Sequence, residues 1–385
     1  MRKWLLPEHI EDILPADARR IEALRRAMLD LFEVHGYELV LPPLLEYVES
    51  LLTGTGHDLD LQTFKLVDQL SGRMLGLRAD IAPQVARIDA HLMNRTGVNR
   101  LCYAGSVLHT LPEGLNRTRE PLQIGAEIYG HAGVESDVEV QRLMLDALQL
   151  AGLSRLQLDI GHVAVFRALV RRAGMDAEAE TELFRATQAK DAAMIASLTR
   201  GIARALRAPL QALPELAGGR EALAQAKRLL PDYAEIRQAL AQLRAIADAL
   251  QDTGAQIGFD LGELRGYHYH SGVVFAAYAA GSSNALARGG RYDEVGAAFG
   301  RARPATGFSM DLREIVAASP GAPTRKAVLA PYRPQDAALQ RRIAALRKAG
   351  GIVIVDLPGH ERARRELGCK HKLARRNGKW AVVRN

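Results

Sequence analysis

The sequence predicts an α+β fold, in which a mixed antiparallel sheet is flanked by helices, with a helical insertion and a small C-terminal α/β unit. Three observations predict it. Short alternating patterns, typical of antiparallel strands, fill 99–129 and 256–279 with few helical segments among them. Residues 164–250 instead place Ala, Leu and Arg at helical spacing. A Pro/Gly-rich break, SPGAP (319–323), then precedes alternating strand and helix patterns.

The first half of the chain begins with a helix that the apolar spacing places over 16–35 and that Gly36 ends. The next segment, 37–47, reads as a short strand interrupted by Pro42 and Pro43, which cannot occupy a central ladder position. The further elements expected here are a hairpin over 64–80 that turns at Ser71-Gly72, a helix over 81–94, strands at 100–110 and 120–130, a helix over 135–152 and a strand at 156–163.

The second half resumes as strands after the insertion, which we place at about 164–250. We expect strands at 256–262 and 267–279, a glycine-rich turn at 287–296, and a final helix from about Phe308. The expected domains are a core over 1–318 and a small basic α/β domain over 324–385. The elements expected in the small domain are strands at 326–332 and 351–357, helices at 335–350 and 361–367, and a hairpin across Asn377-Gly378.

Several classes of protein are excluded by what the sequence lacks. No apolar run reaches 18 residues, so we expect no membrane span. Cys102 and Cys369 form no CxxC pair and cannot build a disulfide framework, which favours a reduced, cytoplasmic protein. There is no GxxxxGK[ST], HExxH or GxSxG motif. His268 and His270 would share a face of a strand but lack a third ligand, so we expect no metal and no cofactor.

The charge is distributed unevenly between the two domains. Residues 325–385 hold 16 Lys/Arg and 4 Asp/Glu, a net charge of +12, whereas the rest of the chain has a net charge of −5. A basic domain can attract a polyanion, although a solvated basic face is the simpler interpretation.

Three segments taken together are specific: GYELVLPPLLEY with LGLRADIAP, then RLCYAGSVLHTLPEGLNRTREPLQIGAEIYG, then LRGYHYHSGVVFAAY with ARGGRYDEVGAAFGRARPATGFSMDL. In this order they resemble the class II aminoacyl-tRNA synthetase core, in particular histidyl-tRNA synthetase, over roughly residues 5–318. The resemblance implies a self-dimer formed through the first motif around Pro43. It also makes the small domain similar to a truncated anticodon-binding unit.

The chain departs from that family where the family handles ATP. A family Phe-Arg pair followed by Glu reads Leu108-His109 and then Leu111. The family's Gly-Leu-Glu-Arg reads Asp-Leu-Arg-Glu, which places Glu314 where an arginine would meet the triphosphate. An imidazole is a weaker cation than a guanidinium, and a carboxylate repels phosphate. We therefore predict a degenerate ATP site and no aminoacylation.

The amino-acid end resembles the family more closely. The resemblance implies that Asp80 supplies the negative charge for the ligand's ammonium group and that Gln123 also binds this group. It further implies that Glu127 accepts a hydrogen bond from the imidazole N–H and that Arg265 pairs with the ligand's carboxylate. Tyr269 and His270 occupy the positions of two family tyrosines that surround the imidazole, and the second of these is changed. Jointly these residues predict a retained histidine pocket, although each alone could be an ordinary polar group of a strand.

A family with this combination is the regulatory subunit of ATP phosphoribosyltransferase, the first enzyme of histidine biosynthesis. The resemblance implies a non-catalytic chain that works in a hetero-oligomer with a separate short-form catalytic subunit and takes L-histidine as effector. Many members lack the last domain, so the basic domain here does not fit this family. It keeps an alternative open, an RNA- or tRNA-binding paralogue of histidyl-tRNA synthetase, although we do not expect nucleic acid to be the main partner. An active histidyl-tRNA synthetase is the other alternative.

Overall fold

The computed structural model describes residues 4–53, 57–112, 114, 117–282, 284–321, 327–359 and 361–384. The chain forms two compact units, Met1–Pro320 and Gly321–Asn385. Part of the predicted boundary at 319–323 and the predicted start of the small domain at 324 lie outside the described residues. Within the part of the chain that is described, no helix is both long and apolar enough to cross a membrane.

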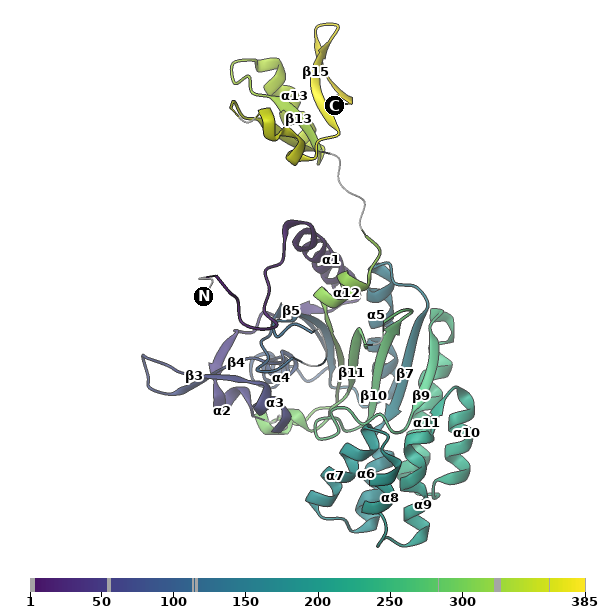
Figure 1. Ribbon diagram of the computed structural model, residues 1–385. Coiled ribbons are helices and arrows are strands. Elements are labelled where there is room, and N and C mark those ends of the chain that lie inside the picture. Colours follow the sequence, from purple (N-terminus) through teal and green to yellow (C-terminus); the bar gives the residue numbers. More distant parts are fainter. Residues whose placement is uncertain are drawn as a thin grey trace. The chain divides into compact units, whose positions relative to one another are not determined.

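The first unit is built on a nine-stranded sheet of order β1-β5-β6-β12-β11-β10-β7-β9-β8 (Figure 1). Its strands are β1 (Glu38–Leu39), β5 (Asn99–Ser106), β6 (Leu122–Tyr129), β7 (Leu156–His162), β8 (Ala217–Gly218), β9 (Gln256–Asp260), β10 (Val273–Ala279), β11 (Ala287–Arg291) and β12 (Ala305–Asp311). β1 runs parallel to β5, and β7 runs parallel to β9. The other pairings are antiparallel, so the sheet is mixed, as predicted for an α+β fold.

One face of this sheet carries the main hydrophobic core. The helices against it are α1 (Pro15–Val34), α5 (Val134–Leu150) and α12 (Leu312–Ala318). The helix α1 begins with Pro15 in its first turn and buries Ile21, Met28 and Phe32, which lie on one face. Along β6, Ile124 and Ile128 point into this core. Gln123 and Glu127, which alternate with these residues along the strand, therefore point to the opposite face, where the candidate site lies.

A second, three-stranded sheet has the order β2-β4-β3, and its β3–β4 hairpin extends away from the large sheet (Figure 1). Its elements are β2 (Leu45–Tyr47), β3 (Phe64–Val67) and β4 (Met74–Leu77), with the helices α2 (Val48–Leu51) and α3 (His57–Gln62). The chain continues into α4 (Ala82–Arg87) and a π-helical turn, η1 (Ile88–Met93). The predicted hairpin turn and the predicted helix at 81–94 are both present.

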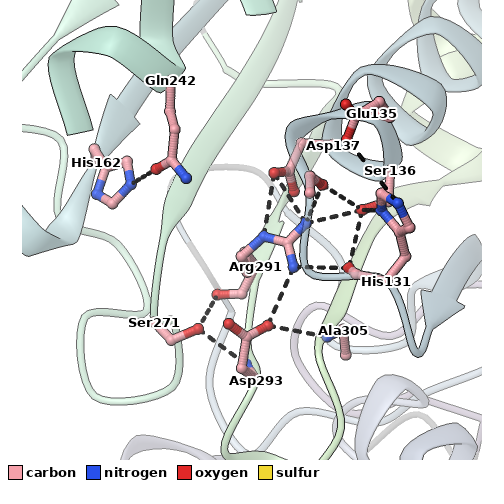
Figure 2. Close-up of polar contacts among 11 residues, drawn as sticks. His131, Glu135, Ser136, Asp137, His162, Gln242, Ser271, Arg291, Asp293 and Ala305 are labelled. Atoms are coloured by element: carbon pink, nitrogen blue, oxygen red, sulfur yellow. Dashed lines mark hydrogen bonds and ion pairs between the residues drawn. The ribbon is translucent and has the colours of Figure 1, made fainter. Parts of the chain in front are cut away.

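The insertion is mostly helical and lies beside β7 and β9 (Figure 1). It comprises α6 (Val163–Ala173), α7 (Ala177–Gln188), α8 (Ala192–Leu198), α9 (Arg204–Ala212), η2 (Leu213–Glu215), α10 (Arg220–Leu229), α11 (Ala234–Ala249) and η3 (Gln251–Thr253). His162 ties it to the sheet, because its Nδ1 accepts the Ala164 N–H at the start of α6 and its Nε2 bonds Gln242 Oε1 at 2.9 Å (Figure 2). Burial lowers the pKa of His162 to about 4, so this ring is neutral near pH 7.

The second unit is a four-stranded sheet of order β14-β13-β15-β16. Its elements are β13 (Ala327–Pro331), α13 (Ala337–Lys348), β14 (Ile352–Asp356), η5 (Glu361–Leu367), β15 (His371–Arg376) and β16 (Lys379–Arg384). Asn377 and Gly378 both have positive φ, at 49° and 75°, which suits the tight hairpin turn that this pair predicts. Asp336 caps α13 by accepting the Leu339 N–H at 2.9 Å.

Three expected elements near the site are wrong. The glycine-rich segment at 287–296 begins as a central strand, β11, rather than a turn. The helix expected from Phe308 begins at Leu312, because β12 pairs with β6 and β11 on its two sides up to that point. The strand expected over 267–279 begins only at Val273, so His268 and His270 lie on a loop and do not share a strand face. The strands β10, β11 and β12 pair with one another in chain order, and β10 and β12 also pair with the distant strands β7 and β6. This pairing overrode the local pattern.

The remaining short element, η4 (Val295–Phe299), packs against α4 and closes a smaller cluster of buried side chains on the site's side of the sheet.

Candidate functional site

A cavity of about 390 Å³ opens on the face of the sheet opposite α5, a volume typical of small-molecule sites. Its floor is made by the strands β6, β12, β11 and β10, and its walls come from the loops before α4, after β5 and before β10. Eight of the nine residues predicted for the histidine pocket or the degenerate ATP site line it: Asp80, His109, Gln123, Glu127, Arg265, Tyr269, His270 and Glu314. Leu111 is 72% exposed and is not among the lining residues.

The floor is hollow because glycines replace side chains at its centre. A Cβ on Gly307 would lie 1.6 Å from Glu127 Oε2, and one on Gly125 would lie 2.5 Å from Tyr103 Oη. Both positions face the cavity on neighbouring strands, since Ser309 pairs with Gly125 and Gly307 pairs with Glu127. Any larger residue there would displace the polar groups that line the cavity.

Glu127 is buried on this floor and accepts two hydrogen bonds. Tyr103 Oη donates to its Oε1 at 3.1 Å, and Tyr292 Oη donates to its Oε2 at 2.5 Å. Burial is the main cause that raises the pKa of Glu127 to about 8, and the nearby charge of Asp80 adds to it. The two tyrosines act in the opposite sense but do not outweigh burial. Near pH 7 this carboxyl is therefore largely protonated and can exchange a proton with a ligand.

The raised pKa of Glu127 predicts a pH-dependent stability. Because the folded chain holds a proton that the unfolded chain releases above pH 4.5, the free energy of unfolding should fall as the pH rises from 4.5 to about 8. Glu127→Gln cannot titrate, so its profile should lack this component. Urea denaturation at several pH values between 5 and 8 measures the difference; parallel profiles for the two proteins would contradict the assigned titration.

Asp80 and Gln123 form the next polar pair of the cavity. Gln123 Nε2 donates to Asp80 Oδ1 at 2.8 Å, and Gln123 Oε1 accepts the Ile81 N–H at 3.0 Å. Asp80 also accepts the Ala82 N–H at 3.2 Å, so the carboxylate is fixed at the start of α4. This places an oriented negative charge in the same cavity as Glu127, which suits a ligand with an ammonium group.

The loop before β10 supplies Arg265, Tyr269 and His270. The Tyr269 ring lies 4.8 Å from the Tyr292 ring, and its buried hydroxyl has no hydrogen-bond partner of good geometry among the described residues. The buried Nδ1 of His270 likewise has no partner there, and burial together with the charge of Arg167 lowers the pKa of His270 to about 4. The Arg265 side chain is half exposed, with its Nε 3.6 Å from Glu263 Oε1. The loop therefore offers a cation, a hydroxyl group and a ring nitrogen to the cavity.

His109 lines the cavity and is fixed by one hydrogen bond to the backbone. Its Nε2 donates to the Ala79 carbonyl at 2.9 Å, so in the neutral ring Nδ1 carries a lone pair. That buried Nδ1 has no partner among the described residues. A lone pair offers no hydrogen bond to a phosphate oxygen.

Glu314, the carboxylate that was expected to repel a triphosphate, is paired with a cation. Arg117 Nε lies 2.8 Å from Glu314 Oε1, and Arg117 Nη2 donates to the Ala285 carbonyl at 3.2 Å. The pair is largely withdrawn from solvent and spans this end of the cavity. The charge repulsion expected from Glu314 is thus offset by Arg117, while both groups are engaged with each other rather than free for a triphosphate.

Arg291 is the last residue of β11 and directly precedes Tyr292. Figure 2 shows its guanidinium among the residues before and within the first turn of α5. It donates to Asp137 Oδ2 at 3.1 Å, to Ser136 Oγ at 2.8 Å, and to the carbonyls of His131 and Gly133. Both members of the Arg291–Asp137 pair are buried. This network fixes the end of β11 to α5 and so positions the Tyr292 hydroxyl at Glu127.

Within the described residues, no three His, Cys, Asp or Glu side chains converge in a way that could hold a metal ion. Cys102 and Cys369 are both free and buried.

Comparisons with known proteins show the family to which this chain belongs. The family model described as histidyl-tRNA synthetase matches residues 9–315, and the model described as the ATP phosphoribosyltransferase subunit HisZ C-terminal domain matches 325–383. A protein of Methylobacillus flagellatus named ATP phosphoribosyltransferase regulatory subunit is 57% identical over 383 residues, covering 100% of this chain and 99% of that protein. The chain belongs to the family of ATP phosphoribosyltransferase regulatory subunits. As their name says, these relatives are regulatory chains and not the catalytic chain.

Other regulatory subunits and solved structures support the assignment. The relative from Ralstonia nicotianae is 59% identical over 390 residues, covering 99% of this chain and 98% of that protein. A crystal structure titled as an ATP phosphoribosyltransferase regulatory subunit/histidyl-tRNA synthetase from Bacillus halodurans C has a TM-score of 0.84 at 29% identity, covering 96% of this chain and 97% of that one. A histidyl-tRNA synthetase from Nostoc sp. PCC 7120, at 16% identity and a TM-score of 0.77, covers 100% of this chain and 97% of that one and shows the shared fold.

The small basic domain is part of this regulatory-subunit family. The expectation that it does not fit is wrong, since the regulatory-subunit relatives match this chain almost end to end and a family model covers the domain itself.

Three polar residues of the cavity that contact the predicted carboxylates were not predicted from the sequence: Tyr103, Arg117 and Tyr292. Tyr103 and Tyr292 stand within the quoted motifs, but their contact with Glu127 joins residues 24 and 165 positions apart. The alternation of β5 could have placed Tyr103 on the cavity face, whereas no local signal pairs Arg117 with Glu314.

Proposed function

We propose that this chain is the non-catalytic regulatory subunit that a separate short-form catalytic subunit requires for ATP phosphoribosyltransferase activity in the cytoplasm, the first step of L-histidine biosynthesis. We further propose that L-histidine bound in the cavity is the effector. The family assignment supports the first part. One observation supports the second part: Asp80, Gln123 and Glu127 line the cavity together. Glu314 and Arg117, in contrast, form an ion pair with each other.

The proposed pose assigns each polar group of histidine a partner. The ammonium lies at Asp80 and Gln123, the carboxylate meets Arg265, and the imidazole meets Glu127 and Tyr269. Histidine can act only through a difference in affinity between two states of the assembly, and such coupling is typically about 1–3 kcal/mol. The catalytic subunit's ligands should then change histidine affinity by the same factor.

The deciding experiment is reconstitution. The chain is co-purified with a short-form ATP phosphoribosyltransferase, and activity is measured with and without it and across a histidine titration. We expect activity to depend on this chain and to fall as histidine rises. A catalytic subunit whose activity is unaffected by this chain would contradict the regulatory role, and unchanged activity with histidine would contradict only the effector.

A self-dimer through the segment around Pro43 is part of the proposal. Apolar side chains of this segment are exposed, with Leu41 77% exposed. The carbonyl of Pro43 accepts a hydrogen bond from Gln84 Nε2 at 2.8 Å, which anchors the segment to α4. A row of exposed leucines on an anchored segment is typical of an interface.

Leu41→Glu should therefore yield a monomer, because it buries a charge in the proposed interface. Sedimentation velocity of the purified chain measures this. Leu70→Glu, at a fully exposed leucine on the β3–β4 turn, is the matched control and should leave the dimer intact. A dimer in both variants would exclude the Pro43 segment.

The second candidate, an RNA- or tRNA-binding paralogue, is favoured only by the +12 charge of residues 325–385. Phosphate contacts would make binding steeply dependent on salt. An electrophoretic shift of tRNA across a salt series tests it. Histidine-dependent pyrophosphate exchange with ATP would in turn reveal an active synthetase.

A further inference from the structure

The loop that faces the cavity is also packed against the helical insertion. We call residues 264–270 the ligand loop; it connects β9 to β10 and is not part of the sheet. Arg265, Tyr269 and His270 line the cavity. Tyr267, between them, is buried in the main core rather than in the cavity. One short loop thus has a ligand side and an insertion side.

Aromatic rings hold the insertion side of the ligand loop. The Tyr267 ring meets Phe166 of α6 edge-on at 5.2 Å and stacks on Phe184 of α7 at 5.5 Å. The His268 ring also lies edge-on to Phe184, at 5.5 Å. Such pairs contribute about 0.5–1.5 kcal/mol each beyond the buried area.

Polar contacts from the same two helices complete the attachment. Arg167 of α6 donates from Nη2 to the carbonyls of Tyr267, at 3.1 Å, and His270, at 3.0 Å. Its guanidinium also lies 5.0 Å from the Tyr267 ring. Tyr267 Oη donates to Glu180 Oε1 of α7 at 2.6 Å. Because these carbonyls belong to a loop with no ladder partner, Arg167 supplies hydrogen bonds that the sheet cannot.

We propose that Arg167 and Phe184 are positioning residues for effector binding: they hold the ligand loop so that Arg265, Tyr269 and His270 face the effector. The inference rests on the proposed function, since it takes histidine as the ligand of the cavity. The insertion would then contribute to effector binding. The helices α6 and α7 order the ligand loop, and the bound ligand orders the same loop, so each of the two effects strengthens the other.

The test measures histidine affinity of the full chain by calorimetry. Arg167→Ala should weaken binding about tenfold, because two loop carbonyls lose their charged donor. Arg172→Ala is the matched control on the same helix: it loses an ion pair to Glu235 and a contact 4.0 Å from the Tyr233 ring, but does not touch the loop. Its affinity should stay within about twofold of the wild type, the scatter that additivity of distant sites allows.

Hydrogen exchange supplies a readout that a purely structural role would not change. Histidine should slow amide exchange in α7, far along the chain from Glu127, and Phe184→Ala should abolish this ligand-dependent protection. Tyr267→Phe keeps the ring stack and loses only the hydrogen bond to Glu180, so it can replace Arg167→Ala or Phe184→Ala in the test if either variant fails to fold. Tyr267→Phe should weaken histidine binding about threefold.

The outcomes separate the two ideas. Histidine binding by the wild type, with unchanged affinity in Arg167→Ala or Tyr267→Phe and no protection of α7, would overturn the positioning role alone. A wild-type chain that does not bind histidine would overturn the proposed effector and this inference together.

Discussion

Replacing Glu127 by glutamine should weaken histidine binding about 10- to 100-fold, the largest effect that we expect of any single change in the cavity. A bound imidazolium would lower the pKa of Glu127 from its value of about 8, because opposite charges stabilise each other, and the carboxylate would then be the charged partner of the ring. A glutamine amide has neither the proton nor the charge, and charge-assisted hydrogen bonds contribute about 1.5–3 kcal/mol. Tyr103 and Tyr292 can still bond the amide, so the fold should survive.

Calorimetry on the purified variant checks this affinity, with circular dichroism to confirm folding. Glu314→Gln is the matched control, because Glu314 lies at the other end of the cavity. It comes shortly after Asp311 of β12, and Asp311 pairs with Gln123, which is four residues away from Glu127 along β6. Its histidine affinity should be unchanged. Equal histidine affinities of Glu127→Gln and the wild type would show that Glu127 does not contact the imidazole. A loss of affinity in Glu314→Gln alone would place the ligand at the Glu314 end of the cavity.

Arg291→Met should lower the free energy of unfolding by about 3–5 kcal/mol, because it leaves Asp137 as an uncompensated buried charge. Two backbone carbonyls and Ser136 Oγ would lose their donor as well. Burial already raises the pKa of Asp137, so the unpaired carboxyl should take up a proton and the variant should recover stability at low pH. Urea denaturation at pH 5 and pH 8 measures both effects.

The control for Arg291 lies on an exposed ion pair of the same helix as Asp137. Arg142 pairs with Asp252 at 2.8 Å near the surface, so Arg142→Met should cost at most about 1 kcal/mol. Adding Asp137→Asn to Arg291→Met should restore part of the loss by removing the buried charge. A loss no greater than that of Arg142→Met would show that the network in Figure 2 does not support β11.

Much of the architecture was predictable from local signals. The spacing of Ile21, Met28 and Phe32 specifies which face of α1 is buried, and Asn377-Gly378 specifies a hairpin. Alternation along β6 sends Gln123 and Glu127 to one face, which is why the predicted polar residues meet in one cavity. These properties depend on residues a few positions apart, and periodicity records them directly.

Other features were decided only by the tertiary structure. The strand β12 exists because it pairs with β6, far away in the sequence, and β11 exists because it lies between β10 and β12, although a helix-like pattern and glycines argued otherwise. The tyrosine bonds to Glu127, the Arg117–Glu314 pair and the grip of α6 and α7 on the ligand loop join segments up to 197 residues apart. The sequence by itself determined most of the elements, the faces that α1 and β6 present and most of the polar residues that line the cavity. The charge of these residues and the hydrogen bonds that hold them depend on burial and on neighbours that only folding brings together. The reason is that a pKa and a hydrogen bond are set by the whole environment of a group and not by its position in the chain.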